Sequence, residues 1–170
     1  MTRLAIRAAL ALTAVALAAC SHYRLGTGGE PAFNRLFIAP VKSEALVPQA
    51  KALVATQLRE AFIKDGRVAL ADAPGDADAT LEVTLSGYRR EPVVSQEQDT
   101  GLTRRFDVTL TARATLTDLR SKKVLFQDRQ LTARRGILSD SGLQQADYQN
   151  LPLLAEILAT DAVHAALDTW

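Results

Sequence analysis

The chain has few of the residues that most often carry chemistry or cross-links. One cysteine among 170 residues excludes an internal disulfide, so an apolar core must hold the fold together by itself. The two histidines, His22 and His164, stand far apart, and no cluster of histidine and cysteine has the spacing of a metal site. The sequence also contains no G-x-S-x-G motif and no phosphate-binding glycine loop. We therefore expect no enzymatic activity, no bound metal and no cofactor.

The chain also lacks an excess of charge of one sign. Its formal net charge is +1, and after the first nineteen residues 18 basic residues stand against 19 acidic ones. Nucleic-acid binding needs a strongly basic face, so the overall charge gives no reason to expect it. Long apolar runs are missing too. The run at residues 8–17 is shorter than the roughly 20 residues that span a bilayer.

The N-terminus has the layout of a secretory signal. Arg3 and Arg7 precede the apolar run at residues 8–17, and small residues follow it. The tetrapeptide Leu17-Ala18-Ala19-Cys20 resembles the bacterial lipobox. This resemblance implies cleavage after residue 19 and lipid attachment at Cys20. An ordinary signal peptide that happens to precede a cysteine is the alternative interpretation.

The residue after the cysteine predicts the destination. Ser21 is not the aspartate that, in the proteobacterial pattern, keeps lipoproteins at the inner membrane. We therefore expect a protein anchored by its acyl chains to the outer membrane, on the periplasmic side. Residues 1–19 would be the signal peptide, residues 20–32 a lipidated N-terminus with a glycine-rich tether, and residues 33–170 a single domain.

The first part of this domain predicts a strand, a helix and a short second strand. Residues 36–39 are apolar and end at a proline, as strands often do. Residues 48–64 have apolar side chains at helical spacing, with Pro48 suited to the first turn and Gly66 to the stop. Residues 68–70 predict the short strand.

Later residues alternate with the period of a strand. Residues 79–86 and 106–117 place apolar side chains on one face and threonines on the other. In residues 124–133 the alternation shifts by one residue near Asp128, which predicts a bulge or a strand end there. Residues 137–148 are expected to form a polar loop, and Asn150 to cap a last helix over residues 151–169.

These elements predict an α+β fold. Two helices would pack on one face of a mixed, mostly antiparallel sheet of four to five strands, forming a two-layer α/β sandwich. The tripeptide Asp99-Thr100-Gly101 matches the aspartic-protease motif, but between two alternating strands it is better explained as a turn.

Several segments together resemble a known family. They are Cys20-x-x-Tyr23-Arg24-Leu25-Gly26, the strand from Leu36 to Val41, the helix around Thr56-Gln57-Leu58-Arg59-Glu60-Ala61-Phe62, Asp78-Ala79-Thr80-Leu81-Glu82-Val83, and Thr109-Leu110-Thr111-Ala112-Arg113-Ala114. The pattern resembles the LptE family of lipopolysaccharide-assembly lipoproteins. This resemblance implies that the protein plugs the outer-membrane β-barrel LptD, and that the pair inserts lipopolysaccharide into the outer leaflet.

The resemblance suggests two sets of contact residues. The threonine-rich face could meet the barrel wall, with Thr109, Thr111 and Arg113 as candidate contacts. Lipopolysaccharide carries phosphates, and paired cations bind phosphates through charge-assisted hydrogen bonds. The basic pairs at the expected strand ends are therefore candidate lipopolysaccharide ligands: Arg89, Arg90, Arg104, Arg105, Lys122 and Lys123.

Simpler interpretations remain open for these residues. Charged strand ends often serve only solubility, and a threonine-rich face can be an ordinary solvated one. A different small lipoprotein, one that activates a peptidoglycan synthase, would have a similar α/β plan. The short tether argues against this alternative, because reaching through peptidoglycan usually needs a long flexible arm.

Overall fold

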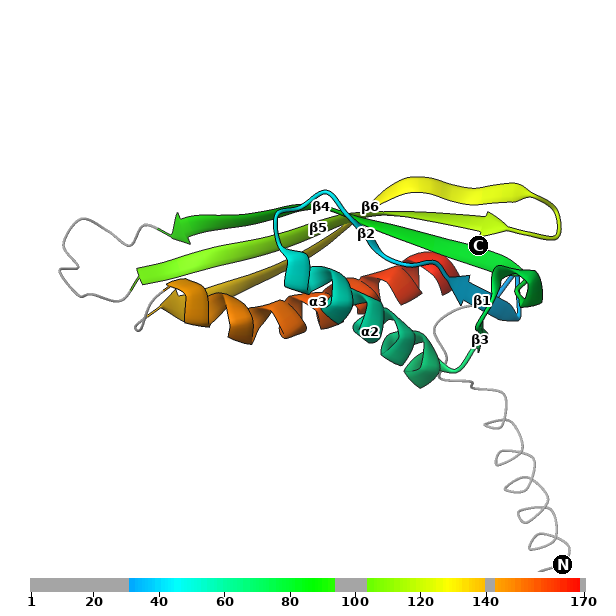
Figure 1. Ribbon diagram of the computed structural model, residues 1–170, viewed down its shortest axis with the longest axis horizontal. Coiled ribbons are helices and arrows are strands. Elements are labelled where there is room, and N and C mark those ends of the chain that lie inside the picture. Colours follow the sequence, from blue (N-terminus) through cyan, green and yellow to red (C-terminus); the bar gives the residue numbers. More distant parts are fainter. Residues whose placement is uncertain (1–30, 94–103, 140–142, 169–170) are drawn as a thin grey trace, which may run out of the picture.

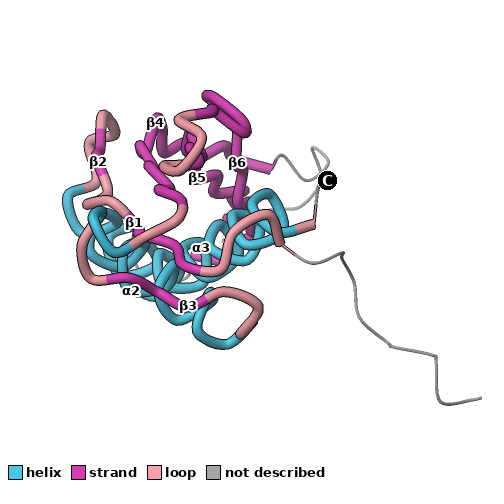
Figure 2. Tube along the Cα trace, turned by 90° about the vertical axis from the view of Figure 1, so that its right-hand side faces the viewer, coloured by secondary structure: helices cyan, strands magenta, loops and turns pink. Residues whose placement is uncertain are grey.

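A computed structural model describes residues 31–93, 104–139 and 143–168, and it shows a twisted sheet with two helices on one face (Figures 1 and 2). The elements follow the order β1 (Arg35–Ile38), β2 (Lys42–Ser43), α2 (Pro48–Asp65), β3 (Ala69–Ala71), the 3₁₀ turn η2 (Pro74–Asp76), β4 (Ala79–Val93), β5 (Arg104–Asp118), β6 (Lys123–Ser139) and α3 (Leu143–Leu167). Cys20, the predicted signal peptide and most of the tether lie outside the described residues. Within them, no helix combines the length and the apolar character needed to cross a membrane.

The sheet is mixed and mostly antiparallel, as predicted. Its strand order is β3-β1-β4-β5-β6, and the two-residue β2 pairs with β4 as a sixth strand. β1 runs parallel to β3 and to β4, whereas β4, β5 and β6 pair antiparallel. The predicted two-layer sandwich with both helices on one face is confirmed.

The core lies between the sheet and the two helices. The alternation of β4 and β5 turns one set of side chains inward, and Leu81, Leu85 and Leu110 are fully buried. From the helices, Leu58 and Leu158 complete the same cluster. Full burial of one such side chain contributes roughly 1.5–3 kcal/mol. No polar side chain among the described residues is buried in this core, so its stability comes from apolar packing.

The ends of α2 match the sequence prediction. Pro48 occupies the first turn, where its missing N–H costs no hydrogen bond. Gly66 ends the helix in the left-handed conformation, with φ of 74°, and its N–H donates to the carbonyl of Phe62 at 3.1 Å.

β4 is longer than predicted. The alternation breaks after Leu85 because the register with β5 shifts between Leu85 and Gly87, and the strand then continues to Val93. A Cβ at Gly87 would lie 2.9 Å from Oγ1 of Thr111, so the close approach of β4 to β5 at this position requires glycine. Arg89 and Arg90 consequently lie within the strand and not at its end.

β6 has the predicted irregularity but does not stop there. Asp128 has a φ of 49°, and the register with β5 shifts beside it. The strand then continues to Ser139, so Arg134 and Arg135 also lie within a strand. The polar loop predicted for residues 137–148 is wrong at both ends, since its first residues belong to β6 and its last to α3.

α3 begins at Leu143, eight residues before the predicted start. Asn150 is therefore inside the helix and does not cap it, and Pro152 is an internal proline. The segment from Leu143 to Asn150 is polar, and its leucine, glutamines and alanine are good helix formers. The apolar stripe begins only at Leu151, which explains why the sequence pattern placed the start too late.

Candidate functional site

The face of β4, β5 and β6 that points away from α2 and α3 carries polar side chains and is not covered by any described element (Figure 1). We call it the outer face. A hollow of about 410 Å³ lies on it, lined by Gly87, Tyr88, Arg89, Glu91, Thr109, Thr111, Gln130 and Arg134. This hollow combines cationic and hydroxyl side chains from three neighbouring strands.

Two arginines flank Thr109 in this hollow. Thr109 pairs with Arg89 of β4 on one side and with Arg134 of β6 on the other. Neighbouring strands are about 4.8 Å apart, so the two arginine backbones are separated by roughly 10 Å. Their side chains are 77% and 64% exposed. Two exposed guanidinium groups at this separation can approach one anionic group from both sides.

Each of these arginines already has one carboxylate partner. Arg89 contacts Glu91 at 3.5 Å, and Arg134 donates to Oδ2 of Asp107 at 2.6 Å. A guanidinium has five N–H donors, so both retain donors for a ligand. Arg134 was not among the lipopolysaccharide ligands predicted from the sequence, although it forms a basic pair with Arg135 at the expected end of the last strand. That pair was the available signal for it, whereas its pairing with Thr109 depends on the strand register.

The predicted arginines do not all lie on one face. Arg105 is exposed and pairs with Val93 on the outer face, four residues along β5 from Thr109, which corresponds to about 13 Å. Arg90 pairs with the buried Val108, so it points to the helix side and is half-buried. Arg104 begins β5, and its side chain lies outside the described part of the chain.

The two lysines lie at the opposite end of the sheet, as expected from the sequence. Lys122 is exposed in the turn between β5 and β6, and Lys123 is exposed at the start of β6. Asp118 closes this turn by accepting backbone N–H bonds from Ser121 and Arg120, and these bonds lower the pKa of its carboxyl. The lysines therefore form a separate cationic group on a well-defined turn.

The three candidate barrel contacts have different surroundings. Arg113 donates to both carboxylate oxygens of Glu44, at 2.7 and 2.9 Å. The hydroxyl of Thr111 donates to the carbonyl of Gly87 at 3.3 Å. The hydroxyl of Thr109 has no hydrogen-bond partner among the described residues, and this half-buried residue lines the hollow. Of the three side chains, only that of Thr109 has no partner among the described residues.

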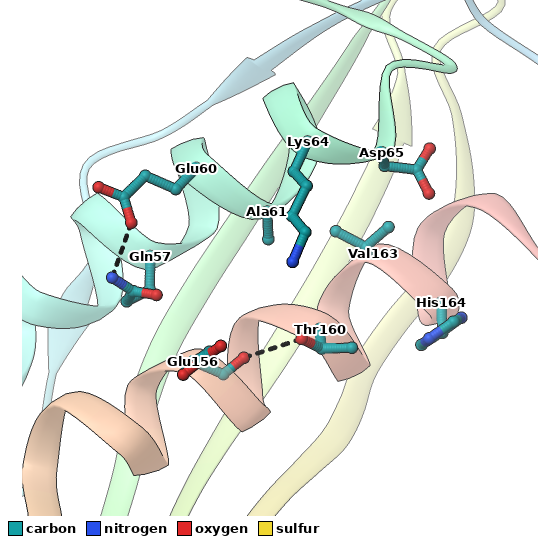
Figure 3. Close-up of a pocket in the computed structure, with 9 residues that line it drawn as sticks. All are labelled: Gln57, Glu60, Ala61, Lys64, Asp65, Glu156, Thr160, Val163 and His164. Atoms are coloured by element: carbon teal, nitrogen blue, oxygen red, sulfur yellow. Dashed lines mark hydrogen bonds between the residues drawn. The ribbon is translucent and has the colours of Figure 1, made fainter.

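A second hollow, of about 420 Å³, lies between α2 and α3 (Figure 3). Lys64 points into it from α2, but three carboxylates also line it, from Glu60, Asp65 and Glu156. These negative charges oppose the binding of a phosphate. The groove between the helices is therefore the weaker candidate for an anionic ligand.

An ion-pair network closes one end of this groove. Arg67 contacts Asp65 at 2.8 Å and Asp168 at 2.6 Å, and Asp168 also contacts Nδ1 of His164 at 2.5 Å. The hydrogen bond from Arg67 lowers the pKa of Asp65. For Asp168, the contacts with His164 and then with Arg67 lower the pKa. The network links the C-terminal ends of both helices.

The described residues offer no metal site, since nowhere among them do three His, Cys, Asp or Glu side chains gather closely enough. What the outer face can do is form hydrogen bonds and ion pairs over a broad surface.

The family model described as LptE, Lipopolysaccharide-assembly, matches residues 33–167. No curated protein sequence matches the chain.

Solved structures share the fold at low sequence identity. A protein from Xanthomonas campestris is 15% identical, with a TM-score of 0.55, over 82% of this chain and 87% of that one. A hypothetical protein from Chlamydia trachomatis is 11% identical, with a TM-score of 0.53, over 79% and 95%. The uncharacterized lipoprotein B from Nitrosomonas europaea is 18% identical, with a TM-score of 0.49, over 86% and 88%. The first two likenesses show that the fold recurs in other bacterial proteins.

Proposed function

Because the chain belongs to the LptE family of lipopolysaccharide assembly, we propose that it is an outer-membrane lipoprotein that plugs an LptD-like β-barrel and helps to place lipopolysaccharide in the outer leaflet. The observation that carries this proposal is the outer face. Three long strands present it, and no described element covers it. The role needs binding surfaces and no bond-making chemistry.

The outer face fits the interior of a barrel. Outer-membrane barrels have polar interiors, so a plug inside one needs a polar surface that forms hydrogen bonds. Thr109 offers a hydroxyl with no partner among the described residues, and Arg89 and Arg134 add charged donors beside it. The helix side of the sheet, in contrast, is already occupied by the apolar core.

The arginines on the outer face also suit the phosphates of lipopolysaccharide. Arg89, Arg105 and Arg134 lie on the same face, and a guanidinium can bind a phosphate through two parallel hydrogen bonds. A plug with such a face would contact the headgroup of lipopolysaccharide while the barrel guides the lipid. Lys122 and Lys123, at the other end of the sheet, are a second possible contact for the same headgroup.

Anchoring would come from the N-terminus. Lipid on Cys20 would hold the domain at the membrane, because each buried acyl CH₂ contributes about 0.8 kcal/mol and several chains act together. A tether of about ten residues would then keep the domain close to the periplasmic side of the barrel.

Affinity purification of the full-length chain from its native envelope, after extraction in mild detergent, tests this function. A large outer-membrane barrel should co-purify in equal amount with the chain. A penicillin-binding protein as the stoichiometric partner, with no barrel, would overturn the proposal in favour of the peptidoglycan-synthase activator.

A further inference from the structure

One edge of the sheet is long and has no neighbour in the described structure. The path β3-β1-β4-β5-β6 ends on one side at the three-residue β3 and on the other at the 17-residue β6. From Arg129 to Ser139, β6 pairs with β5 through eleven consecutive residues without a register shift. Such an edge presents a regular row of N–H and C=O groups, which can pair with another extended chain.

A hollow lies directly beside this edge. α3 packs beneath β5 and β6 (Figure 2), and a hollow of about 330 Å³ is lined by Arg135 of β6 together with Leu153, Glu156, Ile157, Thr160 and Asp161 of α3. A helix with its side chains is about 10 Å wide, whereas a strand occupies about 4.8 Å. The flank of α3 that carries Leu153 and Ile157 is thus wide enough to lie partly under a further strand placed beside β6.

This arrangement has the two features of strand addition. The free edge supplies main-chain hydrogen bonds, and the adjacent hollow receives alternate side chains of the added strand. Leu153 and Ile157 are both half-buried, so an apolar side chain placed there would cover them further.

The charge of the edge indicates what kind of segment would fit. Between Arg129 and Ser139 there are three arginines and no acidic residue. Pairing this edge with the same edge of a second copy would bring three arginines from each copy together along one seam, which is unfavourable. An incoming strand that carries carboxylates beside the edge arginines would be attracted instead, provided that its side chains over the hollow, which Glu156 and Asp161 line, are apolar.

We propose that the β6 edge between Arg129 and Ser139 binds an extended, acidic segment of the barrel partner as an additional strand, with apolar side chains of that segment over Leu153 and Ile157. The inference rests on the proposed function for the identity of the partner. Edge pairing would fix the orientation of the domain inside the barrel, because backbone hydrogen bonds impose a register that side-chain contacts on a broad polar face do not.

Residue-resolved hydrogen–deuterium exchange tests the proposal on the full chain, alone and in the purified complex with its barrel. In an antiparallel sheet, alternate residues turn their N–H groups to opposite edges, so half of the β6 amides bond to β5 and half face outward. In the complex, the outward amides of residues 129–139 should exchange at least tenfold more slowly than in the free chain. The amides that already bond to β5 should change much less.

A pair of matched variants probes the hollow. Ile157→Lys places a charge under the added strand and should weaken the complex at least tenfold. Ile63→Lys makes the same change on α2, where the side chain is 67% exposed, and should leave the complex intact. Near-ultraviolet circular dichroism of both variants checks that they remain folded, and the exchange measurement on the parent chain needs no variant.

The possible outcomes separate this inference from the proposed function. If the complex forms and the outward β6 amides exchange as fast as in the free chain, the strand-addition idea is overturned and the barrel partnership stands. Protection that rises with the concentration of the chain alone would assign the edge to a second copy and also overturn it. If no complex with the barrel forms, the proposed function is wrong, and a segment of the barrel cannot be what binds the β6 edge.

Discussion

The guanidinium of Arg67 donates to the carboxylate of Asp168 at 2.6 Å, although the two residues are 101 positions apart in the sequence. Arg67 also binds Asp65, so a single side chain joins the end of α2 to the end of α3. The hydrogen bond from Arg67 lowers the pKa of Asp65 below its ordinary value of 3.8, and the contact with His164, followed by that with Arg67, lowers the pKa of Asp168. The helix layer is thus held at this end by charge-assisted hydrogen bonds in addition to apolar packing.

This network predicts how stability changes in acid. A carboxyl whose pKa is lowered by folding contributes its stabilisation above the unfolded pKa, near 3.8, and loses it as the pH falls further. Arg67→Ala should therefore lower the free energy of unfolding by about 1 kcal/mol at pH 7, and much less at pH 3. Urea unfolding at both pH values measures the difference. Arg59→Ala, at an exposed arginine of α2, is the control, and an equal loss at both pH values for Arg67→Ala would contradict the account.

Gly87 should tolerate no side chain. A Cβ there would lie 2.9 Å from Oγ1 of Thr111, a short branched side chain with little freedom to move. We expect Gly87→Ala to reduce the free energy of unfolding by about 1–3 kcal/mol, as overpacking does elsewhere. Chemical denaturation provides the measurement. Gly75→Ala serves as a control because a Cβ at Gly75 meets nothing within 4 Å. Equal stability of the two variants would show that the contact between position 87 and Thr111 is not tight.

Much of the fold could be predicted from the sequence, because the long strands alternate and α2 has clear signals at both ends. Leu81, Leu85 and Leu110 were placed on the buried face by period alone, and Gly66 was correctly identified as the helix stop. The short β2 has only two residues, Lys42 and Ser43, and no pattern of that length is visible in a sequence.

The errors have a common physical cause. Bulges shift the alternation by one residue, so a strand that continues past a bulge looks as if it ends. This happened at Gly87 in β4, where the sequence pattern ended the strand too early, while the irregularity near Asp128 was recognised. Arg134 was visible in the sequence as part of the basic pair Arg134-Arg135, but its place beside Thr109 follows from the register of β5 and β6. Contacts across strands depend on register, which the sequence does not display directly.

The paired arginines of the outer face should matter for lipopolysaccharide binding. Arg89→Gln together with Arg134→Gln removes both cations beside Thr109 and should reduce the affinity of the purified domain for lipopolysaccharide at least tenfold at low salt. The loss should shrink as salt rises, because exposed charges are screened beyond about 8 Å at physiological ionic strength. Isothermal titration across a salt series gives the affinities.

The lysine pair provides the comparison for that experiment. Lys122→Gln with Lys123→Gln removes the same number of charges at the opposite end of the sheet. Parental affinity in the arginine variant, with a loss in the lysine variant, would move the phosphate contact to the β5–β6 turn. Parental affinity in both would mean that these cations serve only solubility.

Lipid attachment at Cys20 remains a prediction from the sequence. Cys20→Ala should abolish labelling of the protein by radioactive palmitate and leave an unprocessed precursor, because the thiol is the expected site of acylation. Ser21→Ala is a suitable control, since it changes the neighbouring residue and keeps the thiol. Undiminished labelling of the Cys20 variant would disprove the anchor.

The account depends most on which face of the domain meets the barrel. A photo-reactive amino acid placed at Thr109, on the outer face, should cross-link to a large outer-membrane barrel when the full-length chain is irradiated in its native envelope. The same group at Glu60, on the groove between α2 and α3, should give little or no cross-link to the barrel. Cross-linking from Glu60 with none from Thr109 would contradict the account, because the helices and not the open sheet would then face the barrel wall.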